Sequence, residues 1–127
     1  MCGNYDAGTD GDNAFVAHYS TTGALINRYD LPGSTGVDER CEAIAVGPDG
    51  NVVFGGELGS FPTKDMWVRK LAPNGTELWS MTRDGGGGGN DDVRAIAIDS
   101  DDAVWLCGRE SVAGEGQNIY IAKYLPG

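Results

Sequence analysis

Residues Glu42–Gly56 have the sequence EAIAVGPDGNVVFGG and decide the fold of this 127-residue chain. Two short apolar runs flank a Pro-Asp-Gly-Asn segment, which is the pattern of a tight β-hairpin. In the first run the small side chains of Ala43 and Ala45 fall on one face, and those of Ile44 and Val46 fall on the other. A strand that is apolar on both faces is typical of a sheet packed between two neighbours.

The same pattern recurs along the chain with a period of 52 or 53 residues. Cys41–Val46 matches Val93–Ile98, and Phe15–Tyr19, Trp67–Leu71 and Tyr120–Tyr124 form a second matching series. A period of about 40 to 50 residues built from short strands indicates the blades of a β-propeller.

Each period holds four strand-like segments separated by turn residues, and none has the 3.6-residue spacing of a helix. We therefore predict an all-β fold of four-stranded antiparallel meanders, as one propeller fragment over residues 1–127. The expected blades are a partial one at 1–30, a full one at 38–82 and a partial one at 91–124. Further strands are expected at Val52–Gly56, Val104–Gly108, Leu25–Tyr29 and Leu78–Thr82.

Ten such strands amount to two and a half blades, whereas a closed propeller has about four to eight. An open stack would expose two apolar sheet faces to water. We therefore expect the ring to close by homo-oligomerisation, as a dimer or a trimer with cyclic symmetry.

The run Asp38–Gly56, together with Phe61–Thr63 and Asn13–Ala17, resembles the SBBP-type bacterial β-propeller repeats. The resemblance implies a propeller architecture and an exported bacterial protein, although Met1 is not followed by the residues of a signal peptide. It implies no particular chemistry. The chain departs from the repeats at His18, which aligns with lysines, and at Val53, where an aromatic is usual.

Charge and cysteine content narrow the classes of partner. Nineteen Asp and Glu against nine Lys and Arg give a net charge of −10, which disfavours nucleic acid and anionic membranes and favours cations or basic partners. No apolar run approaches the roughly 18 residues of a membrane span. Cys2, Cys41 and Cys107 are odd in number and include no Cys-x-x-Cys pair, so we expect buried thiols rather than a disulfide.

Alternating strand directions place the longer connections on one face of the sheets, and these connections hold most of the carboxylates. They are Asn4–Asn13, Leu31–Arg40, Glu57–Asp65, Arg83–Asp92 and Arg109–Asn118. Functional residues concentrate in loops displayed by a rigid scaffold, so this acidic face is the expected site. The five glycines of Gly85–Gly89 precede no helix, so we interpret them as a flexible loop rather than a phosphate cradle.

A divalent cation, calcium rather than zinc, is the expected cofactor if these oxygens act as ligands. The candidate metal ligands are Glu42, Asn90, Asp91, Asp92 and, through oligomerisation, His18. The candidate ligand-binding residues are Asp38, Glu39, Arg40 and Arg94. The charges of Arg40 and Glu42 are reversed at Asp92 and Arg94, which suggests ion pairs between neighbouring inner strands. The alternative is that the acidic loops only solvate this face.

Two functions fit these patterns. The first is a self-assembling binding or scaffold module whose acidic loops take a cation or a small ligand. The second is a metal-dependent hydrolase that resembles propeller lactonases, esterases and phosphotriesterases, with Glu42, Asp91 and Asp92 as ligands and Asp38 or Glu39 assisting. The sequence leaves open whether the protein is an enzyme, and it assigns no catalytic residue.

Overall fold

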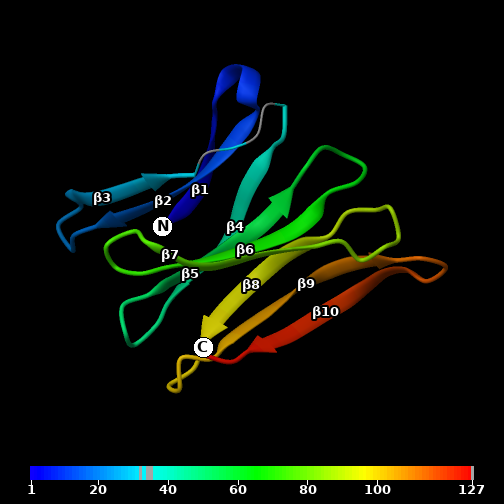
Figure 1. Ribbon diagram of the computed structural model, residues 1–127. Helices are drawn as coiled ribbons and strands as arrows, with labels where there is room; N and C mark the ends of the chain where they lie inside the picture. The colour runs from blue at the N-terminus through cyan, green and yellow to red at the C-terminus, as the bar shows by residue number, and fades with distance from the viewer. Residues whose placement is uncertain (32, 34–35, 127) are drawn as a thin grey trace.

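Three antiparallel sheets make up the computed structural model, which describes residues 1–31, 33 and 36–126 (Figure 1). The first sheet contains β1 (Cys2–Asp6), β2 (Asp12–Tyr19) and β3 (Leu25–Asp30), with one 3₁₀ turn, Gly8–Asp10, between β1 and β2. The second contains β4 (Glu39–Val46), β5 (Val52–Leu58), β6 (Asp65–Leu71) and β7 (Glu77–Arg83). The third contains β8 (Asp92–Ile98), β9 (Val104–Val112) and β10 (Gly116–Tyr124). Strands adjacent in sequence pair within every sheet, so the expected all-β meander architecture is confirmed.

The connections divide between the two ends of the sheets, as the alternating directions require (Figure 1). Short hairpins follow β2, β4, β6 and β8 at one end, and the acidic connections lie at the other. A long loop was expected at Arg109–Asn118, and this expectation is wrong. β9 ends at Val112 and β10 begins at Gly116, so three residues connect the two strands. Residues 32, 34 and 35 of the Leu31–Arg40 connection lie outside the described residues.

The inner strands β4 and β8 carry the same irregularity. The pairing of β4 with β5 skips Glu42, and that of β8 with β9 skips Arg94, so each charged residue lies at a β-bulge. The opposing residues are Gly56 and Gly108, where an added Cβ would lie 2.0 and 1.9 Å from a backbone carbonyl oxygen of the inner strand. Only glycine leaves room for the bulged strand to pass at this distance.

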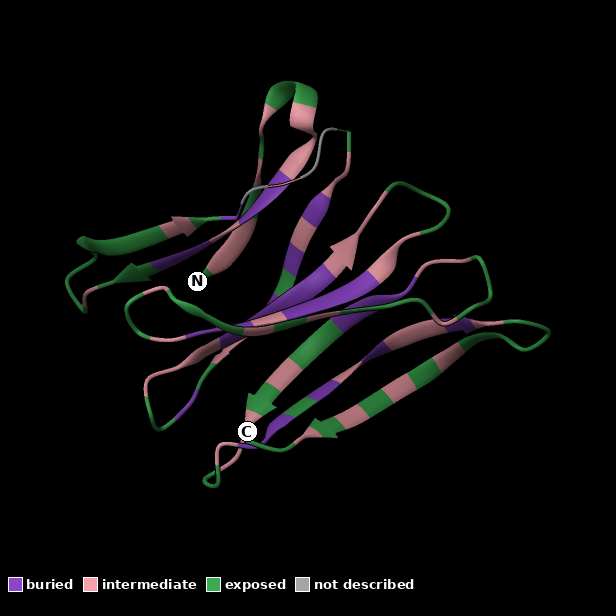
Figure 2. Ribbon diagram, in the orientation of Figure 1, coloured by how far each residue is buried: buried purple, intermediate pink, exposed green. Residues whose placement is uncertain are grey.

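The second sheet is buried on both faces, and Figure 2 shows most of its buried residues on β5 and β6. Phe54 and Trp67 belong to a cluster on the face toward the first sheet, and their rings meet edge to face at 5.7 Å. Val53 and Val68 belong to a second cluster, which reaches the third sheet. Period-2 alternation along β5 and β6 therefore produces two hydrophobic cores, one on each side of one sheet. No helix among the described residues is long and apolar enough to span a membrane.

A disulfide between Cys2 and Cys41 links the first sheet to the second, with Sγ atoms 2.10 Å apart and Cα atoms 5.9 Å apart. The expectation of three buried thiols is therefore wrong for these two residues, and Cys107 alone stays free. The sequence did not indicate the pair, because its members lie 39 positions apart and only the stacking of β1 on β4 brings them together.

Removing this cross-link should destabilise the fold. Closing a loop of this length restricts the unfolded chain, so Cys41→Ser is expected to lower the free energy of unfolding by about 2–4 kcal/mol. Urea unfolding with and without a reductant measures the effect. Cys107→Ser is the matched control and should change little, and a reductant-insensitive wild type would contradict the pairing.

Candidate functional site

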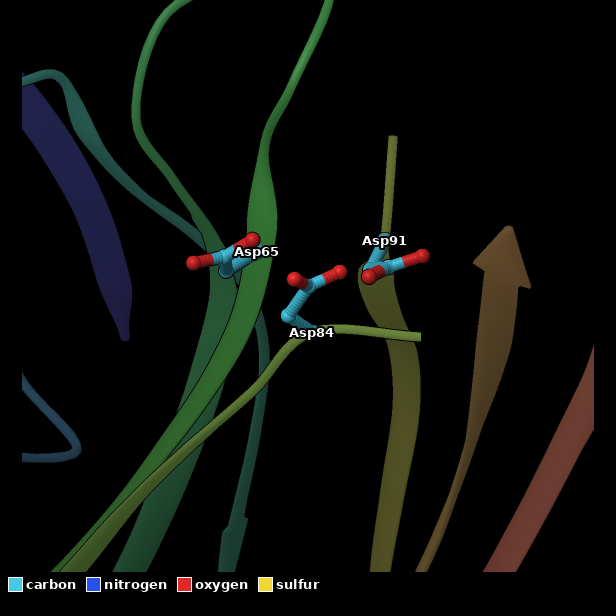
Figure 3. Close-up of side chains that lie close together, drawn as sticks. All are labelled: Asp65, Asp84 and Asp91. Carbon is cyan, nitrogen blue, oxygen red and sulfur yellow. The ribbon is translucent and has the colours of Figure 1, made fainter. Parts of the chain in front are cut away.

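Three aspartates gather where the second and third sheets meet on the acidic end of the molecule (Figure 3). Asp65 begins β6, Asp84 follows β7 and Asp91 directly precedes β8. Each offers one carboxylate oxygen, and these oxygens lie within 4.8 Å of one another. The set thus joins two strands of one sheet to the inner strand of the next.

Asp91 is fully buried and fixed by the backbone. Its Oδ1 accepts a hydrogen bond from the Ser111 N–H, and its Oδ2 accepts one from the Gly85 N–H, both at 2.5 Å. Its own N–H donates to the Lys64 carbonyl oxygen at 2.6 Å. Strand β9 and the connection between β7 and β8 therefore hold this carboxylate in place.

The glycine run Gly85–Gly89 brings Asp84 and Asp91 together by packing on Ser111 of β9. An added Cβ at Gly85, Gly87 or Gly89 would lie within 2.6 Å of Ser111 atoms. The two glycines between them have positive φ, which side chains rarely adopt. The run was interpreted as a flexible loop, whereas in the structure Gly85, Gly87 and Gly89 pack on Ser111, and Gly86 and Gly88 face open space.

Electrostatics at the cluster favour a positive ligand. Burial, together with the nearby charges of Asp84 and Asp91, raises the pKa of Asp65. None of the three carboxylates forms an ion pair with a lysine or arginine of the described residues. Clustered carboxylate oxygens of this kind are ligands that Ca²⁺ prefers.

Asp92, one residue further on, has different partners. Its carboxylate is buried and accepts hydrogen bonds from Arg94 of its own strand, at 2.7 and 2.9 Å, and from Arg109 of β9. Burial by itself would raise the pKa of Asp92, but the two guanidinium groups outweigh it and lower that pKa. Arg94 therefore pairs with Asp92 of its own strand instead of with the expected partner, Glu42 of β4.

Among the remaining candidate residues, Asn90 directly precedes Asp91, and the others are not members of the aspartate cluster. Arg40 lies 3.4 Å from Asp12 and 3.8 Å from Glu57, rather than pairing with Asp92. Asp38 accepts a hydrogen bond from the Asp12 N–H. The locations of the others are as follows: Glu39 is buried 3.8 Å from Arg69, Glu42 is exposed at its bulge, Asn90 bonds to Lys64 and Gln117, and His18 is exposed at the hairpin end of β2.

Burial, opposed in part by Arg69, raises the pKa of Glu39. Of the sequence-derived metal ligands, the cluster contains only Asp91, and it adds Asp65 and Asp84, which sequence reasoning missed. Both lie two positions beyond the expected strands Trp67–Leu71 and Leu78–Thr82, inside the acidic connections Glu57–Asp65 and Arg83–Asp92, but the sequence did not indicate that these two connections meet. No family model matches the chain, and no curated protein matches it either.

The Asp92 pair predicts a pH dependence of stability. The pKa of Asp92 is lower in the folded chain than in the unfolded one, so its charged form stabilises the fold at neutral pH. This stabilisation is lost as the pH falls through the lowered pKa of Asp92. Asp92→Asn should therefore lower the free energy of unfolding by about 1–3 kcal/mol at neutral pH, with the gap closing as the pH falls below the ordinary pKa of an aspartate. Urea unfolding at both pH values measures it, with the exposed Asp101→Asn as control. An equal gap at both pH values would show that the ion pairs contribute nothing.

Proposed function

We propose that this chain is a propeller-type binding and scaffold module, which assembles with further copies and binds a cation on its acidic loop face. The observation that carries the proposal is an uncovered apolar face on the third sheet. Ile119 and Ile121 of β10 are 81% and 68% exposed, and Trp105 of β9 is 43% exposed. Figure 2 shows exposed residues alternating with less exposed ones along β10.

The corresponding positions of the second sheet support the interpretation that this face packs against another sheet in the assembly. Counting back 52 or 53 residues from Ile119, Ile121 and Trp105 leads to Met66, Val68 and Val53. All three are fully buried in the cluster against the third sheet. The outer face of the third sheet thus has the apolar character of a face that is covered elsewhere in the same chain.

Trp105 is well suited to anchor such a contact, because it is already fixed. Its Nε1–H donates to Asp99 Oδ2 at 3.0 Å, and the Lys123 Nζ lies 4.9 Å from the ring centroid. The hydrogen bond from Trp105 is the largest contribution to the lowered pKa of Asp99, which is about 2. An aromatic side chain ordered before binding loses little entropy when it is covered.

A second copy carries a face that suits this surface. On the first sheet, Phe15 lies on the side away from β4. Trp67 in the second sheet and Tyr120 in the third occupy the matching positions of the repeat. Arg28 covers the Phe15 ring at 4.4 Å, and Tyr5 lies 6.5 Å from it. Stacking this face on the third sheet of another copy would repeat the packing inside the chain, and repetition around an axis closes a ring.

Ile121→Lys should disrupt the assembly. The side chain is exposed within one chain, so the fold tolerates the change, but a charge buried without a partner is expected to weaken association at least tenfold. Light scattering coupled to size-exclusion chromatography measures the mass of wild type and variant. Leu125→Lys, at an equally exposed position outside the strands, is the control. A wild type that stays monomeric at every concentration would overturn the proposal.

Cation binding at Asp65, Asp84 and Asp91 is tested with Ca²⁺ by titration calorimetry. Asp84→Asn removes one charge from an exposed position and is expected to weaken binding at least tenfold. Binding should also weaken as the pH falls through the raised pKa of Asp65. Asp101→Asn, an exposed aspartate in a hairpin, is the control, and equal affinity in both variants would exclude this site. Ca²⁺-dependent, chelator-sensitive hydrolysis of an ester or a phosphotriester would assign the hydrolase function instead.

A further inference from the structure

The aspartate cluster has a counterpart one repeat earlier, where the first and second sheets meet at the acidic end. Counting back 52 residues from Asp65 and Asp91 leads to Asn13, the second residue of β2, and to Glu39, the first residue of β4. The two strands begin side by side at this end of the molecule (Figure 1). The repeat therefore brings an amide and a carboxylate to the position that three carboxylates share between the next two sheets.

The contacts of Asp12 place Asn13 and Glu39 at the same junction. The Asp12 N–H donates to Asp38 Oδ1 at 3.1 Å, and the Asp12 carboxylate lies 3.4 Å from the guanidinium of Arg40. Asp38 and Arg40 are the chain neighbours of Glu39, and Asp12 is a chain neighbour of Asn13. The starts of β2 and β4 are thus joined on both sides of Glu39.

Each of these two side chains has a buried oxygen that lacks a partner. Asn13 is 6% exposed and Glu39 is 7% exposed. Neither Asn13 Oδ1 nor Glu39 Oε2 has a hydrogen-bond partner among the described residues. Both atoms are acceptors while Glu39 is ionised, so neither can satisfy the other. Buried acceptors left unpaired are costly, and a cation bound to both oxygens would remove that cost.

A glycine is also repeated at this junction. Gly33 lies 52 residues before Gly85, and an added Cβ at Gly33 would overlap Asn13 Oδ1. Gly85 has the corresponding place beside the aspartate cluster, where its N–H donates to the Asp91 carboxylate. The repeat therefore keeps the close backbone approach at both junctions, together with an acidic residue at each inner strand.

The positive charge nearest to Glu39 leaves its Oε2 atom free. Arg69 Nη2 of β6 lies 3.8 Å from Glu39 Oε1, and Arg69 Nη1 lies 3.7 Å from Glu77. Both distances are longer than those of hydrogen bonds. Burial raises the pKa of Glu39 more than Arg69 lowers it, so Arg69 does not fully balance the buried charge. A further positive charge at Oε2 would stabilise the ionised carboxylate.

We propose that Asn13 Oδ1 and Glu39 Oε2 are ligands of a second cation site, which takes Ca²⁺ between the first and second sheets. Carboxylate and amide oxygens occur together among the ligands of Ca²⁺ in proteins. The site has one charged side-chain ligand, whereas the aspartate cluster has three, so its affinity for Ca²⁺ should be lower. The two sites share no residue, and neither needs the other.

Titration calorimetry with Ca²⁺ tests this site in an Asp84→Asn chain, in which the aspartate cluster is weakened. We expect saturable binding in that chain, with Ca²⁺-dependent changes in the amide NMR signals of Asn13 and Glu39. Adding Glu39→Gln should weaken the binding at least tenfold, because the side chain keeps its shape and loses its charge. Glu115→Gln, at an exposed position between β9 and β10, is the matched control and should change little.

Asn13→Asp makes the opposite change and does not depend on the folding of Glu39→Gln. It supplies a second charged ligand, as Asp65 does in the aspartate cluster, so Ca²⁺ should bind at least tenfold more tightly. Ca²⁺ should also raise the melting temperature of this variant more than that of the wild type. Equal Ca²⁺ affinity with and without Asn13→Asp would overturn the proposal, as would equal affinity in Glu39→Gln and Glu115→Gln.

Failure of this site and failure of the aspartate cluster give different results. Loss of all Ca²⁺ binding in Asp84→Asn would overturn the second site and leave the aspartate cluster in place. If the wild type and Asp84→Asn bind Ca²⁺ equally and Glu39→Gln abolishes the binding, the second site is supported and the aspartate cluster is excluded.

Discussion

Burial of the second sheet on both faces is the constraint on which the rest of the structure depends. β5 carries Val53 toward one neighbour and Phe54 toward the other, so neither flanking sheet can be removed without exposing a core. The large rings of Phe54 and Trp67 fill one interface, and aliphatic side chains fill most of the other. A single alternating strand pair thus orders three sheets into a stack.

The aspartate cluster is a consequence of the same stacking. Asp65 and Asp84 belong to one sheet and Asp91 to the next, so their carboxylates meet only because the second and third sheets pack face to face. The glycine run then allows the connection between β7 and β8 to lie flat against Ser111. Like charges held this close oppose the packing that creates them, and a bound cation would remove that cost.

Strand positions could be predicted from the sequence because they depend on local signals. Alternating apolar residues and turn dipeptides located Glu42–Val46 and Val52–Gly56 inside the observed β4 and β5. The Cys2–Cys41 bond and the Asp65–Asp84–Asp91 set could not be predicted in this way, because each joins residues from different sheets. Asp92 illustrates the limit: its charge was noticed, but the choice of Arg94 and Arg109 as partners depends on a bulge and on strand register.

The shape of the apolar outer face of the third sheet determines what it can bind. The outer face of the third sheet is open across β9 and β10, so covering Ile119, Ile121 and Trp105 together requires another broad face, such as a sheet. The first sheet, which carries Phe15 on its side away from β4, offers a sheet face of this kind in a second copy.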